Sequence, residues 1–183
     1  MVGAARILGR SGESGIHFVI AGDGDNRNYI RNLARDVGNL SFPGWLDRQD
    51  LQRLLLMSDV GVAPYVDSAK QSLPNKLYEY MAAGLPILSS LVGESRKLLS
   101  EESIGLFYRP GDAAALAGSS RWIAARPELR QNMGSKSLEL FNRRFSEDRI
   151  YKAMCDHITH LVAQPIAYPT SSAKCVAASV TAR

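Results

Sequence analysis

Short apolar segments alternate with amphipathic helical segments along most of this chain, and that alternation constrains the fold more than any other feature. Runs typical of buried strands occur at residues 17–21, 40–42, 59–63, 86–89 and 105–108. Apolar residues recur at helical spacing between these runs, as in residues 28–37. Strands that alternate with helices form βαβ units, so the sequence predicts an α/β fold: a Rossmann-like parallel sheet with helices on both faces.

Composition narrows the class of protein. The chain has 183 residues, of which 45% are hydrophobic and 22% charged, as in globular proteins. We expect one domain over residues 1–163 and a disordered tail over residues 164–183, where Ala, Ser, Thr, Val and Pro follow no period. The net charge of +4 permits a phosphate-bearing ligand or an anionic membrane surface but is too small to indicate nucleic acid.

The cysteines and the apolar runs bear on the compartment. Cys155 and Cys175 lie far apart and form neither a metal-binding spacing nor a disulfide framework, which favours a reducing environment. No apolar run reaches the roughly eighteen residues of a membrane span, and the first residues do not resemble a signal peptide. We therefore expect a cytoplasmic protein.

A first candidate site follows the first predicted strand, where Gly22 and Gly24 flank Asp23. A glycine-rich turn at that place lets a phosphate approach the backbone. The dinucleotide fingerprint needs a further glycine where this chain has Arg27, so that motif is excluded. Asp23 and Asp25 also have the spacing of paired carboxylates for a divalent metal, as in metal-dependent phosphatases. The alternative is an ordinary turn in which Asp25 or the next residue caps a helix.

A second candidate site is the helix predicted over residues 74–83, with Pro74 in its first turn and Gly84 as its stop. Unpaired amides and the positive end of the helix dipole suit a diphosphate. Lys76 would add positive charge, and Glu79, one turn later, can accept two hydrogen bonds from a ribose diol. The alternative is an amphipathic helix with an exposed glutamate.

Residues 72–87 resemble the donor-site signature of the retaining GT-B glycosyltransferases of family 4. Glu79 matches the second glutamate of the family's pair, and the following run Met-Ala-Ala-Gly-Leu-Pro-Ile also matches. Four further segments resemble family motifs in the same order: residues 21–24, 42–45, 58–64 and 105–112. The resemblance covers residues 17 to about 160, and its Asn-Lys-Leu-Tyr-Glu-Tyr variant is most similar to bacterial transferases that build surface polysaccharides.

The resemblance implies transfer from a nucleotide-activated sugar to a saccharide or lipid-linked acceptor, with retention of configuration and without a bound metal or cofactor. The residues that it implies for the diphosphate are Leu73, Pro74, Asn75, Lys76 and Leu77, acting through backbone amides. Glu79 would bind the ribose. Gly22, Gly24, Trp45 and Tyr65 would complete the nucleotide-sugar site.

Two departures from the family pattern bear on activity. Gln71 stands where the family has its first glutamate, and a neutral amide can bind a sugar hydroxyl but supplies no charge, so its catalytic role stays open. GT-B enzymes also have two Rossmann-like domains, and this chain resembles the C-terminal one without its first strand. We therefore expect a chain that is inactive alone. Its partner would be an N-terminal acceptor domain, through which contact with the inner face of the membrane is an open alternative. A non-catalytic nucleotide-binding or interaction module is the competing hypothesis.

Overall fold

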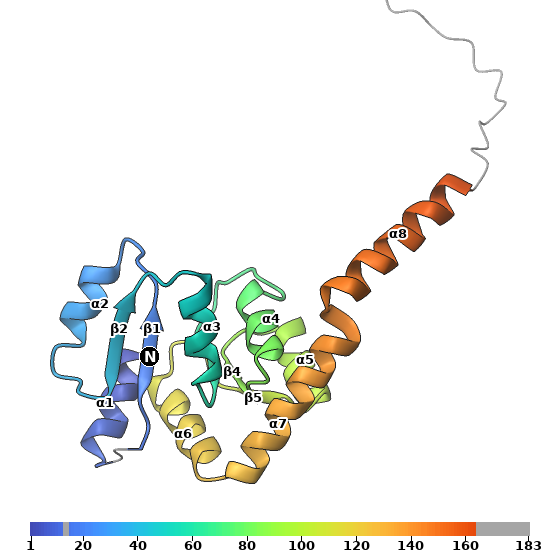
Figure 1. Cartoon of the computed structure of the whole chain (residues 1–183). Helices are drawn as coiled ribbons and strands as arrows, with labels where there is room; N and C mark the ends of the chain where they lie inside the picture. Colours follow the sequence, from blue (N-terminus) through green and yellow to red (C-terminus); the bar gives the residue numbers. More distant parts are fainter. Residues whose placement is uncertain (13–14, 164–183) are drawn as a thin grey trace, which may run out of the picture. The chain divides into compact units, whose positions relative to one another are not determined.

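The computed structural model describes residues 1–12 and 15–163 (Figure 1), and the tail predicted over residues 164–183 lies outside the described residues. The chain divides into two compact units, residues 1–146 and the part from Glu147 onward. The described portion of the second unit is one helix, α8 (Glu147–Ala163). The boundary between the units falls inside the domain predicted over residues 1–163.

The first unit alternates strands and helices as the sequence predicts. Its strands are β1 (Phe18–Ala21), β2 (Leu40–Gly44), β3 (Gly61–Ala63), β4 (Ile87–Ser89) and β5 (Gly105–Phe107). Its helices are α1 (Val2–Arg10), α2 (Arg27–Leu33), α3 (Arg48–Leu56), α4 (Asn75–Ala82), α5 (Glu94–Glu101), α6 (Ala113–Ala124) and α7 (Pro127–Leu140), followed by the π-helical turn η1 (Phe141–Phe145). All five predicted strands are confirmed, and the α/β class with them.

All strand pairs are parallel, but they form two ladders, β1–β2 and β3–β4–β5. A doubly wound sheet has the strand order 3-2-1-4-5-6. In this numbering, β2 and β1 correspond to strands 3 and 2, and β3, β4 and β5 correspond to strands 4, 5 and 6. No described strand corresponds to strand 1. Among the described residues, the two ladders are therefore not joined by a strand between β1 and β3.

The interruption leaves one edge of β1 and one edge of β3 without a strand partner among the described residues. Phe18 N–H donates to Asn39 O (3.0 Å) in the β1–β2 ladder, and Gly61 N–H donates to Pro86 O (2.9 Å) in the other. Backbone groups of successive residues in a strand point to opposite sides. Those of Val19 and Val62 therefore face the interruption.

Two apolar clusters hold the helices on the strands. The first joins α1 and α6 to the β1–β2 ladder and to β4, with fully buried side chains such as Leu8, Leu88 and Leu116. The second packs α4, α5 and α7 around Leu77 and Ile87. Burying a leucine or isoleucine side chain contributes about 1.5–3 kcal/mol, so these clusters provide the main stabilisation of the unit.

Helix ends follow the signals that the sequence predicts. Asp47 accepts a hydrogen bond from Asp50 N–H (2.8 Å) at the start of α3, and Asp112 accepts one from Ala115 N–H (2.8 Å) at the start of α6. Gly84 follows α4 with φ +67°, a left-handed conformation that glycine adopts without steric cost.

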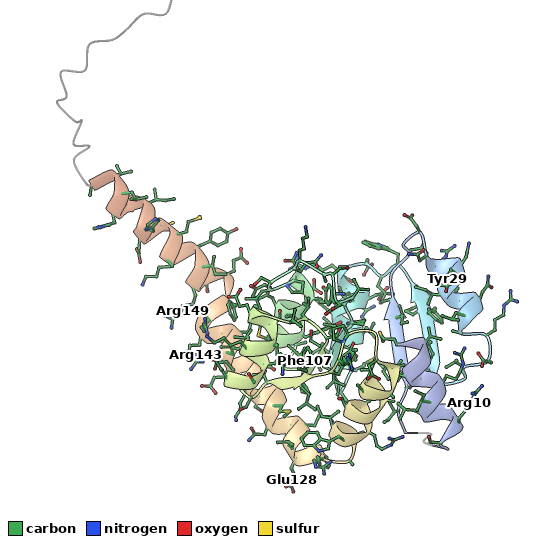
Figure 2. The ribbon with its side chains drawn as sticks, turned by 180° about the vertical axis from the view of Figure 1, so that it is seen from behind. Arg10, Tyr29, Phe107, Glu128, Arg143 and Arg149 are labelled. Atoms are coloured by element: carbon green, nitrogen blue, oxygen red, sulfur yellow. The ribbon has the colours of Figure 1, made fainter. Side chains whose placement is uncertain are left out.

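Figure 2 shows the side chains of the unit from behind. Arg143, labelled there on η1, donates to the Glu102 carboxylate (2.9 Å) just beyond α5 and so ties η1 to that helix. Tyr29 on α2 is exposed. Of the helices that the structure describes, none has the length and apolarity that crossing a membrane requires.

Candidate functional site

The N-terminus of α4 has two backbone amides without a described acceptor. Pro74 takes the position before the helix rather than its first turn, and it has no N–H. Leu77 N–H donates to Pro74 O (2.9 Å). Asn75 N–H and Lys76 N–H have no acceptor among the described residues, so these two amides stand at the positive end of the helix dipole. Of the residues predicted to hold a diphosphate, Pro74 and Leu77 therefore do not offer amides.

Lys76 is held beside this end of α4 by an aromatic ring. Its Nζ lies over the ring of Tyr65, 4.9 Å from the centroid. Tyr65 is half-buried and comes two residues after β3, so the structure brings together two residues that are eleven positions apart. The cation–π contact fixes a positive charge near the open amides.

Glu79 lies one helical turn after Lys76, and its side chain is exposed. The neighbouring Tyr80 is half-buried and donates its hydroxyl to Val62 O (3.1 Å). Burial raises the pKa of Tyr80 to about 12, with a smaller contribution from the charge of Glu79. The exposed Glu79 carboxylate is therefore free of any hydrogen bond to the neighbouring Tyr80 hydroxyl, which is bound to Val62 O.

Gln71 is exposed in the loop that joins β3 to α4. The start of this loop is bound to the end of β4: Tyr65 N–H donates to Ser90 Oγ (2.7 Å), and Ser90 Oγ donates to Tyr65 O (2.9 Å). Ser90 is not among the site residues predicted from the sequence. Its position at the carboxyl end of a predicted strand, where parallel sheets carry their sites, is the signal that could have found it.

The predicted residues Gly22, Gly24 and Trp45 lie at the ends of β1 and β2. Gly22 N–H donates to Gly44 O (2.7 Å), which joins the two loops. Trp45 follows directly and is 78% exposed, so its ring is available for contact. Gly24 O accepts from Arg27 N–H (2.9 Å) in the turn into α2.

Asp23 and Asp25, the carboxylates with the spacing of a metal site, are not accompanied by further metal-ligand side chains in the described structure. Asp23 forms an ion pair with Arg27, the first residue of α2. Within residues 1–12 and 15–163, no three Asp, Glu, His or Cys side chains come together as metal ligands. Asn26, rather than Asp25, takes the cap position of α2, without a side-chain hydrogen bond.

In Figure 1 the loops after β1 and β2 and the loop into α4 lie along one side of the first unit, as expected for carboxyl ends of parallel strands. Surface cavities of the first unit include one of about 400 Å³ beside Arg6 and Asp36 and one of about 550 Å³ between Val19 and Met57. Neither is lined by Lys76 or Glu79. The candidate site is therefore an exposed surface of loops and helix ends.

Fold and loops together define an α/β protein of the doubly wound class, and comparison with known proteins identifies the family. The family model described as "Glycosyl transferases group 1" matches residues 3–125, and the chain belongs to this family.

Two curated relatives show how much of a whole enzyme this chain spans. It is 29% identical over 142 residues to the lipopolysaccharide core biosynthesis glycosyltransferase LpsE of Rhizobium meliloti, covering 76% of this chain and 40% of the relative. It is 27% identical over 134 residues to the N-acetyl-alpha-D-glucosaminyl L-malate synthase of Bacillus anthracis, covering 73% and 34%. The chain thus spans well under half the length of these relatives.

Solved structures show the same fold. The sucrose-phosphate synthase from Thermosynechococcus elongatus superposes with a TM-score of 0.72 at 24% identity, covering 88% of this chain and 42% of that one. Anabaena Alr3699/HepE, solved in complex with UDP-glucose, has a TM-score of 0.66 at 13% identity, covering 86% and 52%. These likenesses confirm the predicted fold.

Proposed function

We propose that this chain is the donor-binding domain of a retaining glycosyltransferase that uses a nucleotide-activated sugar. The observation that carries the proposal is the combination found on α4 of a group 1 glycosyltransferase: two open amides, the Lys76 ammonium and the Glu79 carboxylate within about one helical turn. This order of donors and acceptor suits a diphosphate followed by a ribose.

Each residue then has a chemical role. The amides of Asn75 and Lys76 bind diphosphate oxygens, and the Lys76 ammonium offsets the charge that develops when the diphosphate leaves. Glu79 accepts hydrogen bonds from the ribose hydroxyls. The exposed Trp45 contacts the base, and Gln71 binds a hydroxyl of the sugar without supplying charge.

The relatives support a saccharide or lipid-linked acceptor and a role in bacterial surface polysaccharide synthesis, since LpsE acts in lipopolysaccharide core biosynthesis. The HepE complex supports UDP-glucose as the first donor to test. We expect the chain to transfer no sugar alone, because the reaction holds the sugar between two domains and excludes water there. Robust glycosylated product from the isolated chain, detected by mass spectrometry, would contradict this.

Calorimetric titration with UDP-glucose tests the assignment. Glu79→Ala is expected to weaken binding by about 1.5–3 kcal/mol, since hydrogen bonds to a charged acceptor are lost. Asp25→Ala, which removes an exposed carboxylate from the other candidate site, is the matched control and should bind as the parent does. Chelation with EDTA should leave the affinity unchanged, because amides and Lys76 meet the diphosphate charge. Equal affinities for Glu79→Ala and the parent would exclude the ribose role, and a large loss on chelation would favour a metal at Asp23 and Asp25.

A non-catalytic nucleotide-binding module remains the second candidate, and the neutral Gln71 at the sugar-facing position is the observation that favours it. Joining the chain to an acceptor domain from a related enzyme separates the two. Nucleotide binding without any transfer in such a fusion would favour the module.

A further inference from the structure

The loop from Val66 to Leu73 is held at both ends by one segment, residues 90–95, which connects β4 to α5. At its start, Ser90 binds both backbone groups of Tyr65, as described above. Between the two ends, the one described backbone hydrogen bond within the loop runs from Ala69 N–H to Val66 O (3.0 Å). The loop therefore depends on its ends for its conformation.

Its other end is held through Ser72 by the first turn of α5. The Ser72 hydroxyl donates to the Glu94 carboxylate, and the Ser95 hydroxyl donates to the Ser72 carbonyl. Ser95 is fully buried, whereas Glu94 is exposed at the surface. Gly93, with φ +72°, turns the chain so that both residues begin the helix. Together, Ser72, Glu94 and Ser95 form what we call the Ser72 clasp.

The clasp acts at the point where the loop meets the candidate site. Ser72 directly follows Gln71 and lies two residues before Pro74, the residue that caps α4. Fixing the hydroxyl and the carbonyl of Ser72 therefore restricts the backbone of Gln71 and the approach of the chain to the open amides of Asn75 and Lys76. Ordering a loop in advance reduces the entropy that a ligand must otherwise overcome.

We propose that Glu94 and Ser95 are positioning residues of the nucleotide-sugar site: they hold Ser72, and through it set Gln71 and the start of α4 before the donor binds. This inference rests on the proposed function. Neither residue needs to touch the ligand, and their effect on affinity passes through the loop.

The negative charge of Glu94 separates two explanations, because a positioning role and direct electrostatics predict changes of opposite sign in the affinity of Glu94→Ala for UDP-glucose. A carboxylate near a diphosphate repels it, so Coulomb's law alone predicts that Glu94→Ala strengthens binding of UDP-glucose. Loss of the clasp predicts weaker binding, by roughly 3- to 10-fold, the range expected for the net contribution of one ordinary solvent-exposed hydrogen bond.

The experiment combines hydrogen–deuterium exchange of residues 66–73 with calorimetric titration of UDP-glucose. The variants are Glu94→Ala, Ser72→Ala and the double variant, with Glu94→Gln as the conservative change that keeps an acceptor for the Ser72 hydroxyl. Glu101→Ala is the matched control, since Glu101 is an exposed glutamate at the other end of α5 and pairs with Lys97 (3.7 Å). Glu94 is exposed, so its replacement leaves the core intact.

We expect faster exchange of the loop and weaker binding in Glu94→Ala and in Ser72→Ala, no further loss in the double variant, and recovery in Glu94→Gln. Additive losses in the double variant would show that Glu94 contacts the ligand itself and would overturn the positioning role. Tighter binding of UDP-glucose by Glu94→Ala would also overturn it. So would loop exchange in Glu94→Ala that equals the exchange in a parent that binds UDP-glucose. A parent that binds neither UDP-glucose nor another nucleoside diphosphate would refute the proposed function and the role of the clasp in it, while exchange would still report whether Glu94 holds the loop.

Discussion

Gly61 at the start of β3 is the position where we expect the smallest substitution to have a large effect. A Cβ atom built on Gly61 would lie 2.4 Å from both Cγ and Cδ2 of Tyr80, a separation that real side chains do not reach. The ring belongs to α4, and its hydroxyl is bound to Val62 O at 3.1 Å. Gly61→Ala therefore forces either the ring or β3 to move.

The cost of this change can be estimated from its parts. Overpacking a buried contact costs about 1–3 kcal/mol, and loss of the Tyr80 hydrogen bond adds about 0.5–1.5 kcal/mol. We expect a total near 2–4 kcal/mol. For a unit of this size that corresponds to a fall in Tm of about 4–16 °C.

Urea denaturation tests whether the clash with the Tyr80 ring causes this loss of stability. Gly61→Ala is measured in the parent and in the Tyr80→Ala variant. In the Tyr80→Ala background the two ring atoms are absent, and the cost of Gly61→Ala should fall below about 1 kcal/mol. Gly118→Ala is the control, and it should raise rather than lower the free energy of unfolding. A Cβ at Gly118 meets no atom within 4 Å, and the position is inside α6, where replacing glycine by alanine stabilises by about 0.4–1 kcal/mol. An equal cost of Gly61→Ala in both backgrounds would refute the steric explanation.

Three further predictions concern pH and exchange. Burial raises the pKa of Tyr80 to about 12 from 10.0, so its neutral phenol stabilises the fold fully below about pH 10, and this contribution is lost as the pH rises through the folded pKa. Tyr80→Phe should therefore remove part of the alkaline loss of stability in denaturation series. Hydrogen bonds from Arg6 lower the pKa of Asp36 below its ordinary value of 3.8. The contribution of Asp36 to the free energy of unfolding is therefore present above about pH 4 and is lost as the pH falls through the lowered pKa. Asp36→Asn should reduce the stability that is lost on acidification, as measured by denaturation at a series of acidic pH values. In native-state hydrogen exchange, the Val19 amide should exchange faster than the Phe18 amide, because it faces the interruption between the ladders, and equal protection would show that another segment covers that edge.

The sequence alone determined the order and type of the elements and the location of the candidate helix. Hydrophobic period distinguishes a strand from a helix locally, and caps such as Asp47 and Asp112 act within one turn, so neither depends on distant parts of the chain. The boundaries were less exact: the helix predicted over residues 28–37 ends at Leu33 in the structure, because its last residues form a turn instead. The roles of the site residues stay predictions.

Tertiary structure alone decided which of these local pieces meet. The Tyr65 ring under Lys76, the binding of Tyr65 by Ser90 and the clasp on Ser72 join residues from different loops, and no short-range pattern encodes such pairs. The division of the strands into two ladders is likewise a property of pairing, because each strand forms hydrogen bonds with a partner that is distant in sequence. A local pattern records the conformation that each segment prefers, whereas a site depends on where packing brings the ends of several segments together.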